Sequence, residues 1–124
     1  MPHTHANGKI CYLEIPAQDV DASAAFYTKI FGWKTRLRGD GHTAFDDTTG
    51  AVSGSWVLGR KPSREPGVLA YVMVDDIDAT LKRIVSAGGQ IATPRAAAGP
   101  GGGAFATFTD PVGNLLGLYQ DGRS

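Results

Sequence analysis

The stretch "DVDASAAFYTKIFG" (residues 19–32) carries the start, body and end signals of one helix. Asp19 is a favourable N-cap, and Asp21 adds a negative charge in the first turn, where the helix dipole favours it. Apolar side chains then recur at helical spacing from Val20 to Phe31, and Gly32 follows as a C-terminal stop. The stretch therefore predicts an amphipathic helix over residues 20–31.

The same signals return in "DIDATLKRIVSAGG" (76–89), so the chain contains an internal repeat. The motifs "DVDAS" and "DIDAT" agree in type at every position, with an offset of 57 residues (76 minus 19). Further along, "FDDTTGAVSG" (45–54) matches "FTDPVGNLLG" (108–117) with an offset of 63 (108 minus 45). The six extra residues (63 minus 57) are most simply placed in the glycine-rich loop at 96–103.

Each half of the repeat predicts one helix and four strands. Short runs rich in β-branched and aromatic residues, bounded by turn residues, indicate the strands. In the first half we expect strands near 9–15, 33–38, 42–46 and 51–58 around the helix. In the second half we expect a helix at 77–87 and strands near 68–74, 90–94, 104–109 and 114–120. The prediction is an α+β fold of two tandem βαβββ modules, at about 9–58 and 68–120, joined by a linker at 59–67 within one domain, 1–124.

Composition limits the classes of function. The chain has 124 residues, with 12 basic and 12 acidic side chains and a formal net charge of zero. That balance argues against nucleic acid or an anionic membrane as a partner. Cys11 is the single cysteine, which excludes an intrachain disulfide, and no apolar run approaches the length of a membrane span. We expect a soluble cytoplasmic protein.

Three segments carry a resemblance to a known family: "EIPAQDVDASAAFYTKIFGW" (14–33), "YVMVDDIDATLKRIVSAGGQI" (71–91) and "FTDPVGNLLGLYQ" (108–120). Together they span nearly the whole chain. They resemble the vicinal oxygen chelate superfamily, also called glyoxalase/bleomycin-resistance/extradiol-dioxygenase proteins, and most closely its branch related to lactoylglutathione lyase. The resemblance implies paired βαβββ modules, a small-molecule site and a homodimer. It does not choose a function, because this superfamily hosts isomerases, dioxygenases, resistance proteins and plain binders.

The resemblance also implies four positions for the ligands of a divalent metal, on the first and last strand of each module. In this chain they correspond to Tyr12, Gly54, Leu69 and Gly117. Divalent metals need imidazole or carboxylate donors, and apart from a weak phenol none of these residues supplies a donor. A shift of one residue in register brings in only thiol, hydroxyl and aliphatic side chains. We therefore expect no metal and no other cofactor.

Strand alternation predicts which side chains share the face that would line a ligand cavity. We place Tyr12 with Glu14 on the first strand, and we expect aromatic side chains around the two glycine gaps to form an apolar pocket between the modules. The predicted ligand-binding residues are Tyr12, Glu14, His42, Gly54, Trp56, Leu69, Tyr71, Phe105, Gly117 and Tyr119. The alternative is that these aromatic side chains pack in a core or a dimer interface.

Three functional hypotheses follow. In the first, the protein binds a small apolar or aromatic molecule without a metal. In the second, it is a metal-independent isomerase or lyase in which Glu14 acts as acid or base, because burial among apolar neighbours would raise the pKa of its carboxyl group. That hypothesis fails if Glu14 is solvated or paired with an arginine. In the third, the protein is a structural or regulatory dimer whose cavity is filled by its own side chains.

Overall fold

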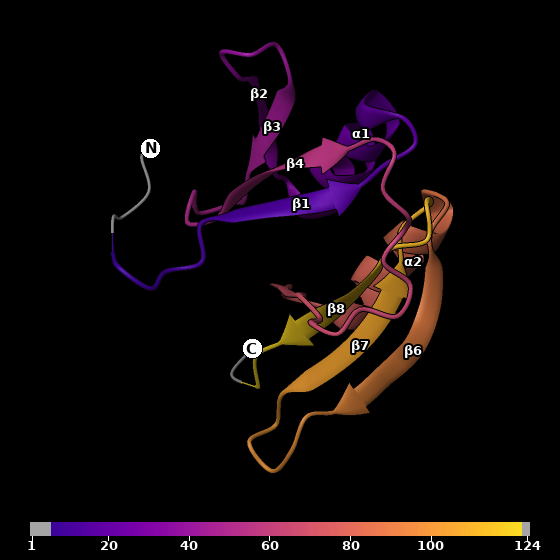
Figure 1. The fold of residues 1–124 in the computed structure, drawn as a ribbon. Helices are drawn as coiled ribbons and strands as arrows, with labels where there is room; N and C mark the ends of the chain where they lie inside the picture. Colours follow the sequence, from indigo (N-terminus) through magenta and orange to yellow (C-terminus); the bar gives the residue numbers. More distant parts are fainter. Residues whose placement is uncertain (1–5, 123–124) are drawn as a thin grey trace. The chain divides into compact units, whose positions relative to one another are not determined.

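The structure, a computed structural model, describes residues 6–122. Two compact units divide the chain after Lys61. Each unit is a four-stranded mixed sheet with one helix (Figure 1). The predicted α+β architecture with two βαβββ modules is confirmed.

The first unit follows the predicted order of elements. Its elements are β1 (Tyr12–Pro16), α1 (Val20–Phe31), β2 (Lys34–Leu37), β3 (Thr43–Asp46) and β4 (Ser53–Val57). The strand order in the sheet is β1-β4-β3-β2. The β1–β4 pair is parallel, and the β2–β3 and β3–β4 pairs are antiparallel. The helix thus connects β1 to the far edge of its own sheet.

The second unit repeats this topology. Its elements are β5 (Tyr71–Met73), α2 (Ile77–Ser86), β6 (Gln90–Ala97), β7 (Ala104–Thr109) and β8 (Leu115–Gln120). The strand order is β5-β8-β7-β6, with a parallel β5–β8 pair. The β6–β7 ladder contains two register shifts, so the longer hairpin of this unit is irregular.

The two helices begin as the sequence predicts. The Oδ1 atom of Asp19 accepts a hydrogen bond from the backbone N–H of Ala22 at 3.2 Å, and Asp76 accepts one from Ala79 at 3.1 Å. Gly32, with φ of 72°, ends α1 in the left-handed conformation that glycine adopts without strain. Within residues 6–122, no helix is long and apolar enough to cross a membrane.

A stack of aromatic rings forms the core of the first unit. Tyr27 of α1 stacks on Trp33 with ring centroids 5.0 Å apart, and Trp33 stacks on Phe45 at 4.6 Å. Trp56 of β4 packs against Phe45 at 4.8 Å. All four side chains are buried. The prediction that Trp56 shares a cavity-lining face with Tyr12 is therefore wrong, because the ring of Trp56 packs on the helix side of the sheet.

The core of the second unit is mainly aliphatic, with one phenylalanine. Ile77 and Ile84 of α2, Phe108 of β7 and Leu118 of β8 are all fully buried, with 0% relative exposure. Leu118 lies opposite Ala106 in the ladder, and Ala106 is fully buried as well. The alternate residues of β7 and β8 consequently point to the face away from the helix.

The turn before the last strand differs in length between the two units. The backbone N–H of Asp47 bonds to the carbonyl of Val52, whereas that of Asp110 bonds to the carbonyl of Asn114. The first turn is thus one residue longer. As a result Phe45 pairs with Gly54, but the repeat-equivalent Phe108 pairs with Leu116.

That extra residue corrects the repeat alignment in the last strand. Because side chains alternate along a strand, a one-residue slip moves each of them to the opposite face. Gly54 pairs with Leu13 and Phe45 and lies on the helix side, whereas Ser55 pairs with Glu14. The counterpart of Gly117 is therefore Ser55. The predicted placement of Gly54 on the cavity face is wrong.

Candidate functional site

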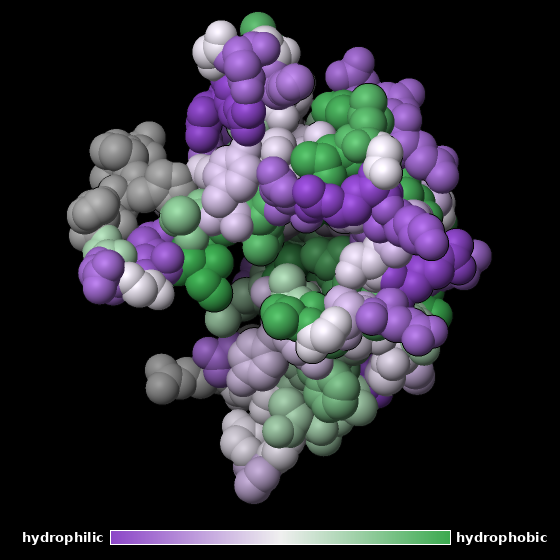
Figure 2. Space-filling view, in the orientation of Figure 1, coloured by the Kyte–Doolittle hydropathy of each residue, from purple (hydrophilic) through white to green (hydrophobic). Residues whose placement is uncertain are grey.

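The face of the first sheet opposite α1 is polar. The pairs Tyr12–Ser53 and Glu14–Ser55 of the β1–β4 ladder lie on this face. Arg36 of β2 lies on the same face, because it pairs with Ala44, which in turn pairs with Ser55. Hydrophilic residues also gather over the β2–β3 hairpin in Figure 2. We call this surface the polar face.

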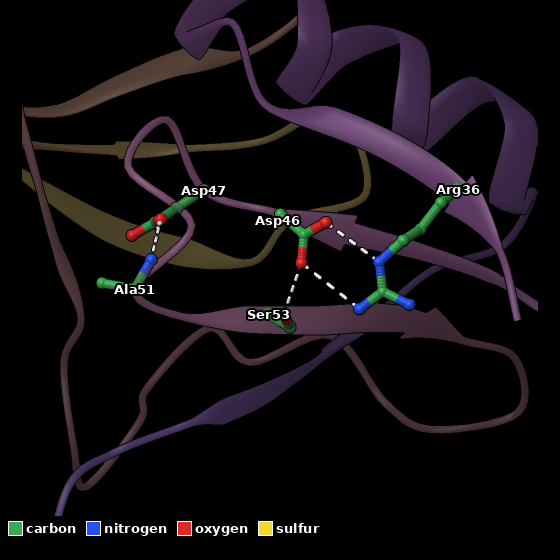
Figure 3. Close-up of polar contacts among 5 residues, drawn as sticks. All are labelled: Arg36, Asp46, Asp47, Ala51 and Ser53. Atoms are coloured by element: carbon green, nitrogen blue, oxygen red, sulfur yellow. Dashed lines mark hydrogen bonds and ion pairs between the residues drawn. The ribbon is translucent and has the colours of Figure 1, made fainter. Parts of the chain in front are cut away.

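A hydrogen-bonded group on the polar face joins three strands of the sheet (Figure 3). Arg36 donates from Nε to Asp46 at 2.9 Å, and the hydroxyl of Ser53 donates to the same carboxylate at 2.5 Å. Beside it, Asp47 accepts the backbone N–H of Ala51 at 2.9 Å and holds the turn into β4. These carboxylates are used to fix the sheet and its turn.

A second polar group lies near the end of β2. Arg38 donates from Nη1 to the hydroxyl of Tyr12 at 2.6 Å and forms a bidentate ion pair with Asp40. The Arg38 guanidinium holds the pKa of the Asp40 carboxyl well below its usual range, and Asp40 raises the pKa of Arg38. Asp40 also accepts the backbone N–H of His42 at 3.1 Å, so the group fixes the loop between β2 and β3.

A cavity of about 750 Å³ adjoins this group within the first unit, and we call it the first cavity. It lies at one end of the sheet, beside the start of α1. The residues that line it are Glu14, Gln18, Asp19, Val20, Asp21, Arg38, Gly41, His42, Thr43, Ser55, Trp56, Val57 and Leu58. Three predicted site residues are among them: Glu14 and His42, which are exposed, and Trp56, which is buried.

Glu14 lacks the environment that the acid–base hypothesis requires. Its carboxylate accepts a hydrogen bond from Nη2 of Arg60 at 2.8 Å, and 47% of its side chain is exposed. The acid–base hypothesis required a carboxylate buried among apolar neighbours, and Glu14 is instead exposed and paired with an arginine. The structure thus corresponds to the alternative in which this residue is tied to an arginine.

The open face of the second sheet is aromatic. Tyr71 of β5, Phe105 of β7 and Tyr119 of β8 line a cavity of about 370 Å³ together with Ala97 and Ala98. Phe105 pairs directly with Tyr119 in the β7–β8 ladder. Tyr71 is 50% exposed, so much of its ring is accessible. We call this surface the aromatic face.

Gly117 makes room for one of these rings. Gly117 pairs with Tyr71 in the β5–β8 ladder, and a Cβ atom added at Gly117 would overlap the Tyr71 ring. The gap in β8 is therefore filled by Tyr71, which lies across the strand instead of standing away from it. Leu69, the other predicted residue of this region, is half-buried and precedes β5.

The predicted residues thus fall into two sets, one in each unit. The second-unit set of Tyr71, Phe105, Gly117 and Tyr119 shares one face, as predicted. In the first unit, Tyr12 and Glu14 share the polar face, but Gly54 and Trp56 lie on the other side.

Sequence reasoning also missed three residues of the first unit: Arg36, Arg38 and Ser55. Alternation along the predicted strand near 33–38 places both arginines on one face, which was a usable signal. The face on which Ser55 lies could not be predicted without knowing the length of the turn before β4.

The residues at the implied metal positions do not fit a metal. The Tyr12 hydroxyl accepts from Arg38, Leu69 is apolar, and Gly117 has no side chain. The corrected register brings Ser55 to the fourth position, and a neutral hydroxyl is a poor ligand without carboxylate or imidazole partners. In residues 6–122, no group of three or more His, Cys, Asp and Glu side chains could hold a metal ion.

Comparisons with known proteins agree with this architecture. The family model described as the Glyoxalase/Bleomycin resistance protein/Dioxygenase superfamily matches residues 9–118. A crystal structure of a protein of this superfamily from Burkholderia phytofirmans superposes with a TM-score of 0.74 at 18% identity, covering 92% of this chain and 99% of that one. At this level of identity the superposition supports the fold alone.

Curated relatives are similar over most of this chain. The "Glyoxylase-like domain-containing protein" of Didymella fabae is 32% identical over 120 residues, which cover 87% of this chain and 90% of the relative. The anthracycline biosynthesis protein DnrV of Streptomyces peucetius is 30% identical over 135 residues, which cover 94% of this chain and 48% of DnrV. The chain spans about half the length of several curated relatives, including CFP32 of Mycobacterium bovis, of which it covers 45%. The repeat, the two sheets and these matches show that the chain belongs to the glyoxalase/bleomycin resistance protein/dioxygenase superfamily.

Proposed function

We propose that the protein binds a small aromatic molecule on the aromatic face of its second unit, without a metal. The observation that carries this proposal is the cavity of about 370 Å³ lined by Tyr71, Phe105 and Tyr119. Flat aromatic surfaces with hydroxyl groups at their edges bind planar ligands by stacking and orient them by hydrogen bonds.

The composition of the cavity wall supports an aromatic ligand over a charged one. The remaining lining residues, Ala97 and Ala98, are small and apolar, and no charged side chain is among the described residues that line this cavity. A volume of about 370 Å³ lies at the lower end of the range for ligand pockets. The name of one relative, DnrV, refers to anthracycline biosynthesis, and anthracyclines are polycyclic aromatic compounds.

Binding is favoured over catalysis by the state of the acidic residue on the polar face. Glu14 is exposed and paired with Arg60, so it is poorly suited to proton transfer. The aromatic face offers tyrosine hydroxyls, but no carboxylate or imidazole lines its cavity among the described residues. Binding of an aromatic ligand is the simplest function for a cavity lined in this way.

The proposal is tested with naphthol as the probe, whose own fluorescence reports its transfer from water to the protein. We expect saturable binding to the wild-type protein. Tyr71→Ala removes the most exposed ring of the cavity and should weaken binding by about tenfold, because a stacked ring contributes about 1 kcal/mol beyond its buried area.

The matched control is Val85→Ala. Val85 is 51% exposed on α2 and is not among the residues that line the cavity. This variant should bind naphthol as the wild-type protein does. Equal affinities of the Tyr71 and Val85 variants, or the absence of saturable binding to the wild-type protein, would refute the proposal.

A further inference from the structure

Two glycines of the second unit lie directly against tyrosine side chains of the aromatic face. A Cβ atom added at Gly117 would lie 2.9 Å from Cγ and 2.5 Å from Cε2 of the Tyr71 ring. A Cβ atom added at Gly103, which precedes β7, would lie 2.8 Å from the hydroxyl oxygen of Tyr119. Side chains do not pack at such distances, so each tyrosine occupies space that only a glycine leaves open.

Backbone conformation does not explain these two glycines. Neither Gly103 nor Gly117 has a positive φ, in contrast to Gly99 and Gly102 in the same loop as Gly103. Another residue could therefore adopt the backbone conformation of either position without strain. What glycine provides at positions 103 and 117 is the space that it leaves to the tyrosine side chains.

The backbone of Gly117 is held inside the sheet. Gly117 pairs with Tyr71 of β5 on one side and with Thr107 of β7 on the other, and its N–H bonds to the carbonyl of Ala70 at 2.8 Å. A methyl group at this position would therefore displace the ring of Tyr71 instead of the strand. Tyr71 is 50% exposed and lines the aromatic cavity, so its ring would move outward into the cavity.

The backbone of Gly103 is held by its neighbours in the loop. Its carbonyl accepts the N–H of Ala98 at 2.9 Å. Gly122 packs so closely against the same loop that a Cβ atom added at Gly122 would lie 2.7 Å from the nitrogen of Gly103. A methyl group at Gly103 would thus displace the hydroxyl end of Tyr119, which is the second tyrosine that lines the cavity.

The volume of the aromatic cavity matches a ligand of two fused rings. A volume of about 370 Å³ corresponds to about twelve water molecules, since each takes about 30 Å³ in the liquid. A single six-membered ring with one hydroxyl group replaces roughly half of these molecules, and two fused rings replace nearly all of them. Tyrosine rings displaced into the cavity would leave room for the smaller ligand only.

We propose that Gly103 and Gly117 are specificity-determining residues of the aromatic cavity, and that its ligand is an aromatic compound of two fused rings. The glycines set the side chains of Tyr119 and Tyr71 back against the backbone. The space that this leaves accommodates the second ring of the ligand. This assignment rests on the proposed binding of aromatic molecules and extends it to the size of the ligand.

The test compares naphthol with phenol, because the two differ by one fused ring. The affinity of naphthol is measured from its own fluorescence, and that of phenol from its competition with naphthol. We expect the wild-type protein to bind naphthol about tenfold more tightly, since the second ring buries additional apolar surface. Gly117→Ala should weaken naphthol binding about tenfold and phenol binding by no more than about twofold. Partial unfolding would lower both affinities equally and leave the preference for naphthol unchanged.

Two further glycine variants lie in one loop and form a matched pair. Gly103→Ala should lower the preference for naphthol over phenol about threefold, because it displaces the Tyr119 hydroxyl. Gly101→Ala should leave the preference at its wild-type value, since Gly101 has no positive φ and an added Cβ atom there meets nothing within 4 Å. Gly103→Ala also serves if Gly117→Ala does not fold.

A double-variant cycle connects the effect to the ring of Tyr71. In the Tyr71→Ala background there is no ring to displace, so adding Gly117→Ala should cause no further loss of naphthol affinity. An equal loss in both backgrounds would overturn the proposal, as would an unchanged preference for naphthol in both Gly103→Ala and Gly117→Ala. Naphthol binding by the wild-type protein would stand in either case, so failure of this proposal is distinguishable from failure of the proposed function.

Discussion

Gly54 and Gly117 occupy equivalent positions in the sequence repeat, but they have different roles in the structure. Gly117 accommodates the ring of Tyr71 on the aromatic face. A Cβ atom at Gly54 would instead overlap the Phe45 ring and the backbone carbonyl of Leu13 on the helix side. Gly54 is needed for packing in the core, and Gly117 is needed for the surface that we propose to bind a ligand.

This difference predicts that Gly54→Ala destabilises the protein. The side chain of Phe45 is stacked on Trp33, and the carbonyl of Leu13 is part of the sheet, so neither can move freely. We expect a loss of about 2 kcal/mol in the free energy of unfolding, measured with urea, as for other overpacked cores. The control is Gly39→Ala, where an added Cβ meets nothing within 4 Å. Equal stability of the two variants would contradict this prediction.

At the scale of elements, the sequence predicted the helices well because their signals are local. An N-cap, helical periodicity and a glycine stop placed α1 at its observed bounds, Val20–Phe31. The strand faces depended on the length of one turn. The turn at 47–52 contains one more residue than its counterpart in the second unit, and the sequence pattern does not reveal this difference. The repeat alignment therefore placed Gly54 on the wrong face of the first sheet. The residues of the aromatic face in the second unit did not depend on that turn.

The two turns also differ in how they are held. In the second unit Asp110 accepts the backbone N–H groups of Val112, Gly113 and Asn114. The Asn114 side chain donates to Asp110 at 2.8 Å and accepts the N–H of Ser63 at 2.8 Å, and thereby fixes the linker to the turn. In the first unit Val52 takes the place of Asn114 in the backbone pairing, and its apolar side chain cannot hold the turn in this way. There Asp47 accepts the backbone N–H of Ala51 instead.

Asn114→Ala should therefore destabilise the second unit. It removes two hydrogen bonds and leaves the carboxylate of Asp110, which is 3% exposed, with fewer partners. We expect the free energy of unfolding to fall by about 2 kcal/mol, since an unsatisfied buried group costs its desolvation. The comparison variant is Thr49→Ala in the equivalent turn. It removes two exposed hydrogen bonds, one donated to Asp47 and one accepted from the backbone N–H of Ala51, and should change stability by less than about 0.5 kcal/mol. A larger loss of stability in Thr49→Ala than in Asn114→Ala would show that the hydrogen bonds of the Asn114 side chain are unimportant.

At the scale of the whole molecule, the same topology occurs twice but presents side chains of different character. The topology is the same in both units, yet the open face is polar in the first and aromatic in the second. Of the positions from which the resemblance implies metal ligands, Tyr12 and, in the corrected register, Ser55 lie on the polar face, and Gly117 lies on the aromatic face. The fold thus keeps its sheets and helices while the chemistry depends on a few outward-facing positions.

This view predicts that the protein works without a divalent metal. A metal that binds only the folded state would raise the melting temperature, and its removal would lower it. We expect chelator-treated and untreated protein to have the same melting temperature and the same naphthol affinity, and added Mn²⁺ to raise neither. Elemental analysis of the untreated protein is the decisive measurement. A stoichiometric divalent metal whose removal lowers the melting temperature would show that donors outside the four implied positions hold an ion, and the metal-free reading of both faces would have to be abandoned.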